Sequence, residues 1–92
     1  MSLEIPDGYD HHVLDDVVHD GDGLTLKYAG RVFGGVLPEL LEADVLQAVL
    51  PGSDIIVRYH RAAPGQPATQ IAHLLVRDRR KNIWAELYTD EG

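Results

Sequence analysis

Residues 37–50 carry the clearest helical pattern in the chain. Apolar side chains recur there at steps of three and four residues, which places them on one face of a helix. They are Leu37, Leu40, Leu41, Val45, Ala48 and Val49. Pro38 suits the first turn, where the N–H that proline lacks would have no partner, and Pro51-Gly52 is typical of a helix end. The pattern predicts one long helix over residues 37–50.

Three segments that follow this helix alternate between two faces, as β-strands do. Residues 54–62 and 83–89 each place successive side chains on opposite faces, and residues 69–77 are apolar on both faces, as expected for a central strand covered on two sides. The connections between the segments are short, and the second is the polar turn at residues 78–82. Because short connections join antiparallel neighbours, we expect a three-stranded meander.

The first half of the chain allows two interpretations. Residues 24–29 alternate as a strand, and the acidic segment 20–23 before them is typical of a turn. Residues 11–20 fit a helix with the apolar side chains on one arc, or a strand, which their valines and paired aspartates favour. We therefore predict a β-hairpin over about residues 13–33, preceded by an N-terminal arm at residues 4–12.

These elements follow one another in the order ββαβββ, which predicts an α+β fold. We expect an antiparallel β-sheet of four to five strands with one long helix packed on one face. If residues 11–20 are helical, the order becomes αβαβββ. A single helix covers only part of such a sheet, so some side chains are expected near an open face: Leu74, Val76, Trp84 and Tyr88. A homodimer, or another protein, would bury that surface.

Length and composition narrow the class further. The 92 residues suit one domain, 1–92, and a hydrophobic content of 45% argues against disorder. The chain has no cysteine, which excludes disulfides and thiolate zinc sites. No apolar run approaches the ~18 residues of a membrane span, and no basic segment leads into an apolar stretch at the start. We therefore expect no membrane partner and a cytoplasmic location. Residues 1–3 and 91–92 are candidates for additions made for expression.

The net charge of −7 is unevenly distributed. Residues 1–50 contain ten acids and two bases, whereas residues 51–92 contain five acids and six bases. An acidic first half would repel nucleic-acid phosphates, so we do not expect nucleic acid as the main partner. The basic turn at residues 77–82 is the exception, with four cations: Arg77, Arg79, Arg80 and Lys81. It would allow weak nucleic-acid binding, with Trp84 and Tyr88 offering stacking.

The sharpest chemical hypothesis is a metal site within residues 11–20. On a helix, His12, Asp16 and His19 lie four and three residues apart, so their side chains converge on one side. Imidazole nitrogen and carboxylate oxygen suit zinc, manganese or iron, and a bound water would make the chain a small metal-dependent enzyme. The same residues also fit a solvated acidic surface, and the sequence identifies no further ligand.

Acid–base and nucleophilic chemistry find little support. Ser2 and Ser53 are the only serines, neither lies in a Gly-x-Ser-x-Gly motif, and cysteine is absent. His60 and His73 lie on neighbouring predicted strands and would act as a pair only if they faced each other. We therefore assign no catalytic, cofactor-binding or metal-binding residue and expect no cofactor.

The expected function is that of a small acidic domain that binds or regulates without catalysis. It would self-associate through its sheet as a homodimer, or bind another protein. The excess of six arginines over two lysines is typical of a high-GC bacterial genome. Two alternatives stay open: a metal-dependent enzyme using the cluster at residues 11–20, and nucleic-acid binding through residues 77–82. The sequence does not identify a small-molecule ligand.

Overall fold

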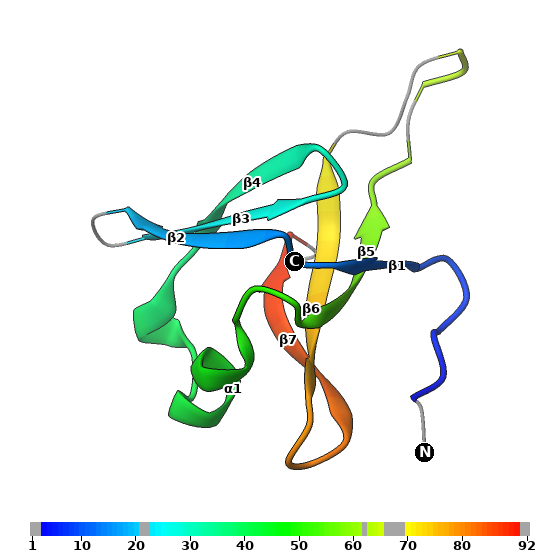
Figure 1. Ribbon diagram of the computed structural model, residues 1–92. Helices are drawn as coiled ribbons and strands as arrows, with labels where there is room; N and C mark the ends of the chain where they lie inside the picture. Colours follow the sequence, from blue (N-terminus) through cyan, green and yellow to red (C-terminus); the bar gives the residue numbers. More distant parts are fainter. Residues whose placement is uncertain (1–2, 21–22, 62, 66–69, 91–92) are drawn as a thin grey trace.

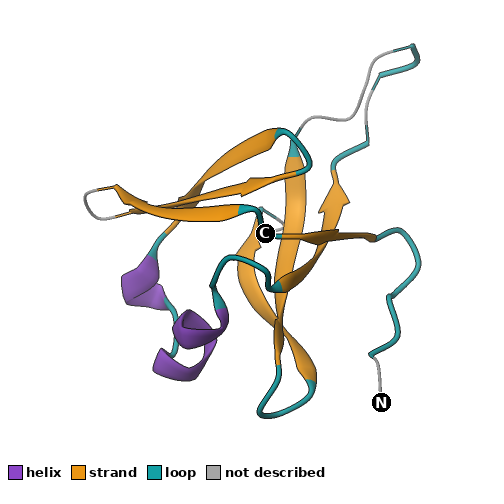
Figure 2. Ribbon diagram, in the orientation of Figure 1, coloured by secondary structure: helices purple, strands orange, loops and turns teal. Residues whose placement is uncertain are grey.

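Two antiparallel β-sheets form the protein, as Figures 1 and 2 show for the computed structural model, which describes residues 3–20, 23–61, 63–65 and 70–90. One sheet has four strands in the order β1-β5-β6-β7, and the other has three in the order β2-β3-β4. The strands are β1 (Asp10–Val13), β2 (Asp16–Asp20), β3 (Gly23–Tyr28), β4 (Arg31–Val36), β5 (Asp54–Tyr59), β6 (Ile71–Asp78) and β7 (Ile83–Thr89). A short 3-10 helix, η1 (Pro38–Leu40), and one turn and a half of helix, α1 (Ala43–Ala48), connect the sheets.

The chain passes from one sheet to the other at a corner between β1 and β2. The N–H of Leu14 donates to the carbonyl of Ser53 at 2.9 Å, beside the four-stranded sheet. The next N–H, that of Asp15, donates to the carbonyl of Lys27 at 2.7 Å, in the three-stranded sheet. The side chain of Leu14 is buried at this corner, which therefore joins the two sheets through both backbone and core.

The hydrophobic core lies between the two sheets. Alternate residues of β3, β5 and β6 are buried there, as the period of two in a strand requires. The innermost are Leu24, Leu26, Tyr28, Ile55, Val57, Leu74 and Val76. Where β4 approaches β7, the rings of Phe33 and Tyr88 meet edge to face with their centroids 5.0 Å apart. The core thus depends on contacts between strands that are distant in the sequence.

The predicted α+β fold with one long helix on a single sheet is wrong. A second sheet, rather than a long helix, covers the four-stranded sheet. Residues 37–50 form η1 and α1, separated by Leu41 and Glu42 in extended conformations with ψ of 143° and 149°. This break lets Leu41 pack against the core while Leu40 stays 75% exposed. Neither helix has a side-chain hydrogen bond at its N-cap that would favour a longer helix.

Residues 11–20 form β1 and β2, so the helical interpretation of this segment is wrong. The predicted hairpin over residues 13–33 exists as β2 and β3, but a second turn adds β4. That turn has Ala29 and Gly30 both at positive φ, 49° and 73°. Alanine rarely adopts this conformation, so the sequence gives only a weak turn signal there. The predicted three-stranded meander is confirmed as β5, β6 and β7.

Residues 3–9 form an N-terminal arm, shorter than predicted because β1 begins at Asp10. The arm lies on the side of the four-stranded sheet away from the three-stranded sheet (Figure 1). The indole N–H of Trp84 donates to the carbonyl of Glu4 at 2.9 Å, and the Tyr9 hydroxyl bonds to His73. Of the flanking residues 1–3 and 91–92, only Leu3 lies within the described part of the chain.

The sheet surface predicted to be open is largely closed. Leu74 and Val76 are fully buried between the sheets, and Trp84 and Tyr88 are half-buried. The expectation of an exposed apolar face at these residues is therefore wrong, because the three-stranded sheet covers one side of the meander and the arm lies on the other. Within the described residues, neither helical segment has the length and apolar character needed to cross a lipid bilayer.

Candidate ligand-binding site

The turn between β6 and β7 is organised by the carboxylate of Asp78. This side chain is only 2% exposed, and its Oδ1 atom accepts the backbone N–H of Arg80 at 3.0 Å and that of Lys81 at 3.3 Å. An aspartate at the first position of a turn commonly makes such bonds. Asn82, at a φ of 53°, ends the turn before β7. Asp78 therefore fixes the backbone from which the basic side chains project.

The loop between α1 and β5 faces this turn. The hydroxyl of Ser53 donates to the carbonyl of Ala48 at 2.7 Å, and the N–H of Ser53 donates to the carbonyl of Leu50 at 3.0 Å. The N–H of Gly52, a residue with a φ of 89°, donates to the carbonyl of Leu14 at 2.7 Å. These bonds attach the loop to the corner between the sheets, so both walls of the site rest on ordered backbone.

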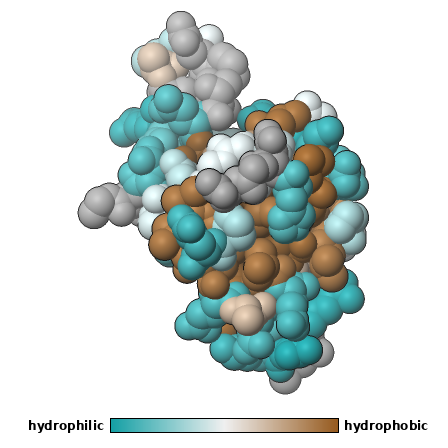
Figure 3. Space-filling model, turned by 90° about the vertical axis from the view of Figure 1, so that its left-hand side faces the viewer, coloured by the Kyte–Doolittle hydropathy of each residue, from teal (hydrophilic) through white to brown (hydrophobic). Residues whose placement is uncertain are grey.

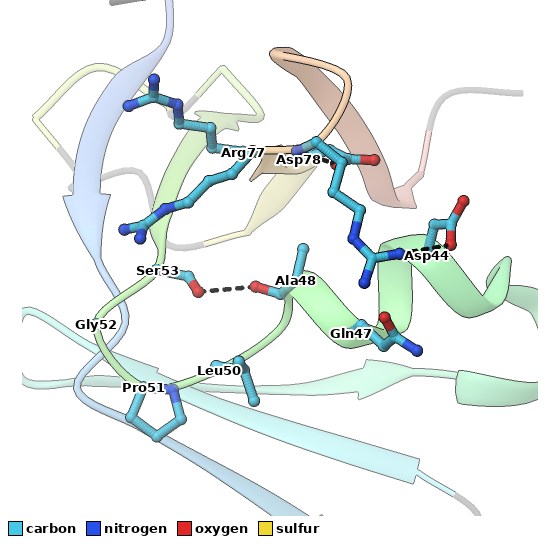
Figure 4. Close-up of a pocket in the computed structure, with 11 residues that line it drawn as sticks. Asp44, Gln47, Ala48, Leu50, Pro51, Gly52, Ser53, Arg77 and Asp78 are labelled. Carbon is cyan, nitrogen blue, oxygen red and sulfur yellow. Dashed lines mark hydrogen bonds and ion pairs between the residues drawn. The ribbon is translucent and has the colours of Figure 1, made fainter.

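A cavity of about 300 Å³ lies between α1, this loop and the β6–β7 turn, and we call it the turn cavity (Figure 4). Arg77 and Asp78 lie along one side of it, and Leu50, Pro51 and Ser53 lie along the other. The remaining lining residues are Asp44, Gln47, Ala48, Gly52, Arg79 and Arg80. Small ligands commonly bind in hollows of this size that combine apolar surface with a few polar groups.

The side chains around the turn cavity carry a net positive formal charge, because three arginines face two aspartates. Arg80 lies 3.6 Å from the Oδ1 atom of Asp44, but both side chains are largely exposed, at 73% and 46%. An exposed pair of this kind contributes only about 0.2–1 kcal/mol and yields to a stronger partner. Arg79 makes no ion pair with any residue that the structure describes. The cavity therefore offers guanidinium groups that an anion can engage.

The second oxygen of Asp78 lies in a different environment from the first. Its Oδ2 atom is buried and has no hydrogen-bond partner among the described residues. Leaving a carboxylate oxygen buried without a donor costs free energy, and nearby cations offset part of that cost. Arg77 and Arg79 are the sequence neighbours of Asp78 on either side. Two cations therefore flank this buried carboxylate along the chain and also line the cavity.

The residues of the metal hypothesis, His12, Asp16 and His19, are not grouped as the helical interpretation required. His12 lies on β1 with its ring centroid 5.0 Å from that of Tyr28, whereas Asp16 and His19 lie three residues apart on β2, on opposite faces of that strand. The Oδ1 atom of Asp16 accepts the neighbouring N–H of Val17 at 2.9 Å. Across the described ranges, no three histidine, aspartate or glutamate side chains are grouped as metal ligands. The helical spacing on which the metal hypothesis depended is absent.

The histidines of the sheet pair with carboxylates instead of with each other. His60 Nε2 lies 2.9 Å from Asp90 Oδ2, and His73 Nε2 lies 2.8 Å from Glu86 Oε2. The residue opposite His73 in the strand register is Arg58, so His60 and His73 do not face each other. The Tyr9 hydroxyl is hydrogen-bonded to Nδ1 of the same ring, so both ring nitrogens of His73 have partners.

The buried Tyr28 and the half-buried Tyr59 form a hydrogen-bonded pair. The hydroxyls of Tyr28 and Tyr59 are 2.8 Å apart, and the guanidinium of Arg31 lies 5.1 Å from the centre of the Tyr59 ring. Burial, and then the hydrogen bond to Tyr59, raise the pKa of Tyr28 well above its ordinary value of 10.0. Because the raised pKa keeps the Tyr28 hydroxyl protonated, this group is poorly suited to act as a general acid.

Sequence reasoning identified the basic turn but missed the other half of the cavity. Arg77, Arg79 and Arg80 were considered only as a nucleic-acid contact. Gln47 and Leu50 were expected on a continuous helix, and nothing in their spacing indicates that the α1–β5 loop faces the turn. The available signal was Asp78, because an aspartate that opens a basic turn predicts an ordered rather than a mobile loop.

Comparison of the chain with protein-family models, curated proteins and solved structures found no match.

Proposed function

We propose that the protein is a non-catalytic binding module that takes a small anionic ligand in the turn cavity. The observation that carries this proposal is the Asp78-ordered turn, which holds Arg79 and Arg80 beside an apolar wall. Four of the eight basic residues of a chain with a net charge of −7 lie in this one turn. Such a concentration of cations in an acidic protein attracts anions locally.

The lining indicates the class of ligand. Arginine forms paired hydrogen bonds with carboxylate and phosphate oxygens, and Gln47 adds amide donors at the same opening. Ala48, Leu50 and Pro51 supply apolar surface next to these groups. A phosphate or carboxylate attached to a compact apolar body fits this combination. Leu50, which is 57% exposed, would lose much of its contact with water when such a ligand binds.

The same surroundings favour a small anion over a nucleic acid. Lys81 lies 4.0 Å from Glu42, and Arg80 lies 3.6 Å from Asp44, so carboxylates border the basic turn. A long polyanion would extend beyond the turn and approach an otherwise acidic molecule. A compact ligand engages the guanidinium groups without that repulsion.

Among the described residues that line the turn cavity there is no thiol and no unbonded hydroxyl, and this supports a binding role. The chain has no cysteine, and Ser53, which borders the cavity, donates its hydroxyl to a backbone carbonyl at 2.7 Å. Asp78 is committed to the turn through two backbone donors. We propose, as the sequence led us to expect, that the protein carries out this binding in the cytoplasm.

Phenyl phosphate tests the proposal, because it joins a phosphate to a compact ring. Calorimetric titration should give saturable binding to the wild-type protein, and Arg79→Gln should weaken it about tenfold or more, since a charge-assisted hydrogen bond contributes about 1.5–3 kcal/mol. Arg61→Gln is the matched control, because it removes the same charge from an exposed residue outside the cavity. Equal losses in both variants, or tighter binding of a single-stranded oligonucleotide than of phenyl phosphate, would overturn the small-anion site.

Self-association is a separate part of the proposal, and its surface differs from the predicted one. Leu37 and Leu40 of the η1 region are 44% and 75% exposed, beside a hollow of about 360 Å³ between η1 and β7. Figure 3, which views the side of the molecule that carries η1, shows a continuous hydrophobic area there. Glu86 is the only charged residue lining the hollow. Two copies with a charge of −7 each repel one another, so an uncharged surface is where a second copy would contact the first.

Sedimentation velocity tests this surface. The wild-type protein should form a dimer at high micromolar concentration, and Leu40→Asp should be monomeric because it places a carboxylate in the apolar contact. Val32→Asp, which changes an exposed apolar residue of the three-stranded sheet, should leave the dimer intact. A wild-type protein that stays monomeric at these concentrations would contradict self-association.

A further inference from the structure

A second cavity, of about 340 Å³, lies between the N-terminal arm and the four-stranded sheet, and we call it the arm cavity. Each strand of the sheet contributes one side chain to it, and the arm contributes two. The six residues are Leu3, Ile5, His11, Asp54, Arg77 and Trp84. The turn cavity shares only Arg77 with it, so the two sites are distinguishable by substitution.

One end of the arm cavity is polar. Asp54 lies between two basic groups, with its Oδ1 atom 3.0 Å from His11 Nε2 and its Oδ2 atom 3.8 Å from the Arg77 guanidinium. The Arg77 guanidinium also donates to Asn82 Oδ1 over a long 3.4 Å. Asp54 orients the imidazole and the guanidinium from one side. The Nε2 atom of His11 is engaged with Asp54, so the Arg77 guanidinium supplies the N–H donors at this end, which suit a carboxylate or another planar acceptor group.

The other end is apolar and aromatic. The indole N–H of Trp84 already donates to the Glu4 carbonyl at 2.9 Å, which ties the arm to the ring and satisfies the one polar group of that ring. Leu3 and Ile5, from the arm on either side of Glu4, face the same cavity. The remaining indole surface and these two aliphatic side chains form a wall against which a flat ring can pack.

We propose that the arm cavity is a binding site for a small aromatic carboxylate. The ring of the ligand packs between Trp84 and the aliphatic side chains of Leu3 and Ile5. Its carboxylate reaches the N–H groups of the Arg77 guanidinium at the polar end. This site shares Arg77 with the proposed anion site, but its other five lining residues belong to it alone, so either site can fail without the other.

Trp84 provides the probe, because it is the only tryptophan in the chain. 4-Nitrobenzoate is a planar aromatic carboxylate whose nitro group quenches indole fluorescence on contact. Titration should quench Trp84 in a saturable way without changing its fluorescence lifetime, which identifies a bound complex rather than collisions. The uncharged 4-nitrobenzyl alcohol should quench only by collision, with a linear response and a shortened lifetime.

Substitutions at the rim locate the site. Ile5 is an exposed residue of the arm that lines the apolar end of the cavity. Ile5→Asp places a carboxylate there and should weaken 4-nitrobenzoate binding about tenfold or more, since like charges repel at close range. Val18→Asp is the control, because Val18 is similarly exposed on the other sheet. Arg79→Gln should leave this binding unchanged even though it weakens phenyl phosphate binding, so each site can fail separately. Linear collisional quenching in the wild type, or saturable quenching unaltered by Ile5→Asp, would overturn the proposal.

Discussion

The guanidinium of Arg77 lies 3.8 Å from the carboxylate of Asp54. Arg77 lies near the end of β6, where the turn cavity and the arm cavity adjoin. Arg77 lines both the turn cavity and the arm cavity, whereas Asp54 lines only the arm cavity. An anionic ligand in either cavity would therefore contact the Arg77 guanidinium. The structure places both proposed sites around one shared residue.

Arg77→Gln should consequently weaken binding of both phenyl phosphate and 4-nitrobenzoate. Each affinity should fall by about tenfold, the effect expected for loss of one charge-assisted hydrogen bond. Arg79→Gln should affect only the first ligand and Ile5→Asp only the second. Parallel titrations of the three variants check this pattern. If Arg77→Gln altered neither affinity, its side chain would have no part in either site.

Asp78→Ala should destabilise the protein and disorder the basic turn. The substitution removes the acceptor for the N–H groups of Arg80 and Lys81, and it leaves a small void at a residue that is 2% exposed. We expect the free energy of unfolding to fall by about 1–3 kcal/mol, as measured by urea denaturation.

Asp7→Ala, at an exposed position of the arm, should have little effect and serves as the control. Part of the loss in Asp78→Ala is offset, because the buried Oδ2 atom that lacks a partner disappears with the rest of the carboxylate. Unchanged stability together with unchanged phenyl phosphate binding would show that Asp78 does not organise the turn.

Stability should fall as the pH rises above about 10 through the linkage of Tyr28. The pKa of Tyr28 is raised in the folded state, chiefly by burial, so the folded protein keeps a proton that the unfolded chain loses near pH 10. The stabilising effect is complete below the unfolded pKa and is lost progressively above it. Urea denaturation of the wild type and of Tyr28→Phe at several alkaline pH values measures the difference. Parallel pH profiles for the two proteins would contradict the burial of the Tyr28 hydroxyl.

Tyr9→Phe should loosen the N-terminal arm. The Tyr9 hydroxyl is hydrogen-bonded to His73, and the ring of Tyr9 lies 5.5 Å from the Arg58 guanidinium, so the residue ties the arm to two strands. Loss of the hydroxyl should shift Trp84 emission to longer wavelength, because Trp84 is held beneath the same arm. Tyr88→Phe is the control, since Tyr88 packs against Phe33 on another side of the fold. Identical emission in Tyr9→Phe and the wild type would show that the arm does not depend on this bond.

The strands could be read from the sequence where alternation and turn residues agree. Residues 83–89 were predicted with the bounds that β7 has, because a polar turn precedes an alternating segment. The prediction of one helix over residues 37–50 was wrong because apolar spacing does not reveal the break in the middle of the segment. At this break Leu41 packs against the core and Leu40 is exposed to solvent. The second sheet was missed because the turn at Ala29 requires a positive φ at an alanine.

The candidate sites were only partly predictable for a related reason. The four cations of the turn are adjacent in sequence, and composition alone reveals them. The opposite wall is formed by a loop that faces the turn only because Leu14 and Gly52 are hydrogen-bonded at the sheet corner. His11, Asp54, Arg77 and Trp84 come together only through the strand order β1-β5-β6-β7. Contacts between distant strands thus decide where the chemistry gathers.

Mapping of backbone amide chemical shifts during titration with millimolar phenyl phosphate tests the central claim most directly. We predict saturable shifts confined to residues 44–53 and 77–81, with those of Arg79 and Arg80 among the largest. Amides of the three-stranded sheet should stay in place. Absence of saturable shifts, or shifts centred away from α1 and the β6–β7 turn, would contradict an anion site in the turn cavity.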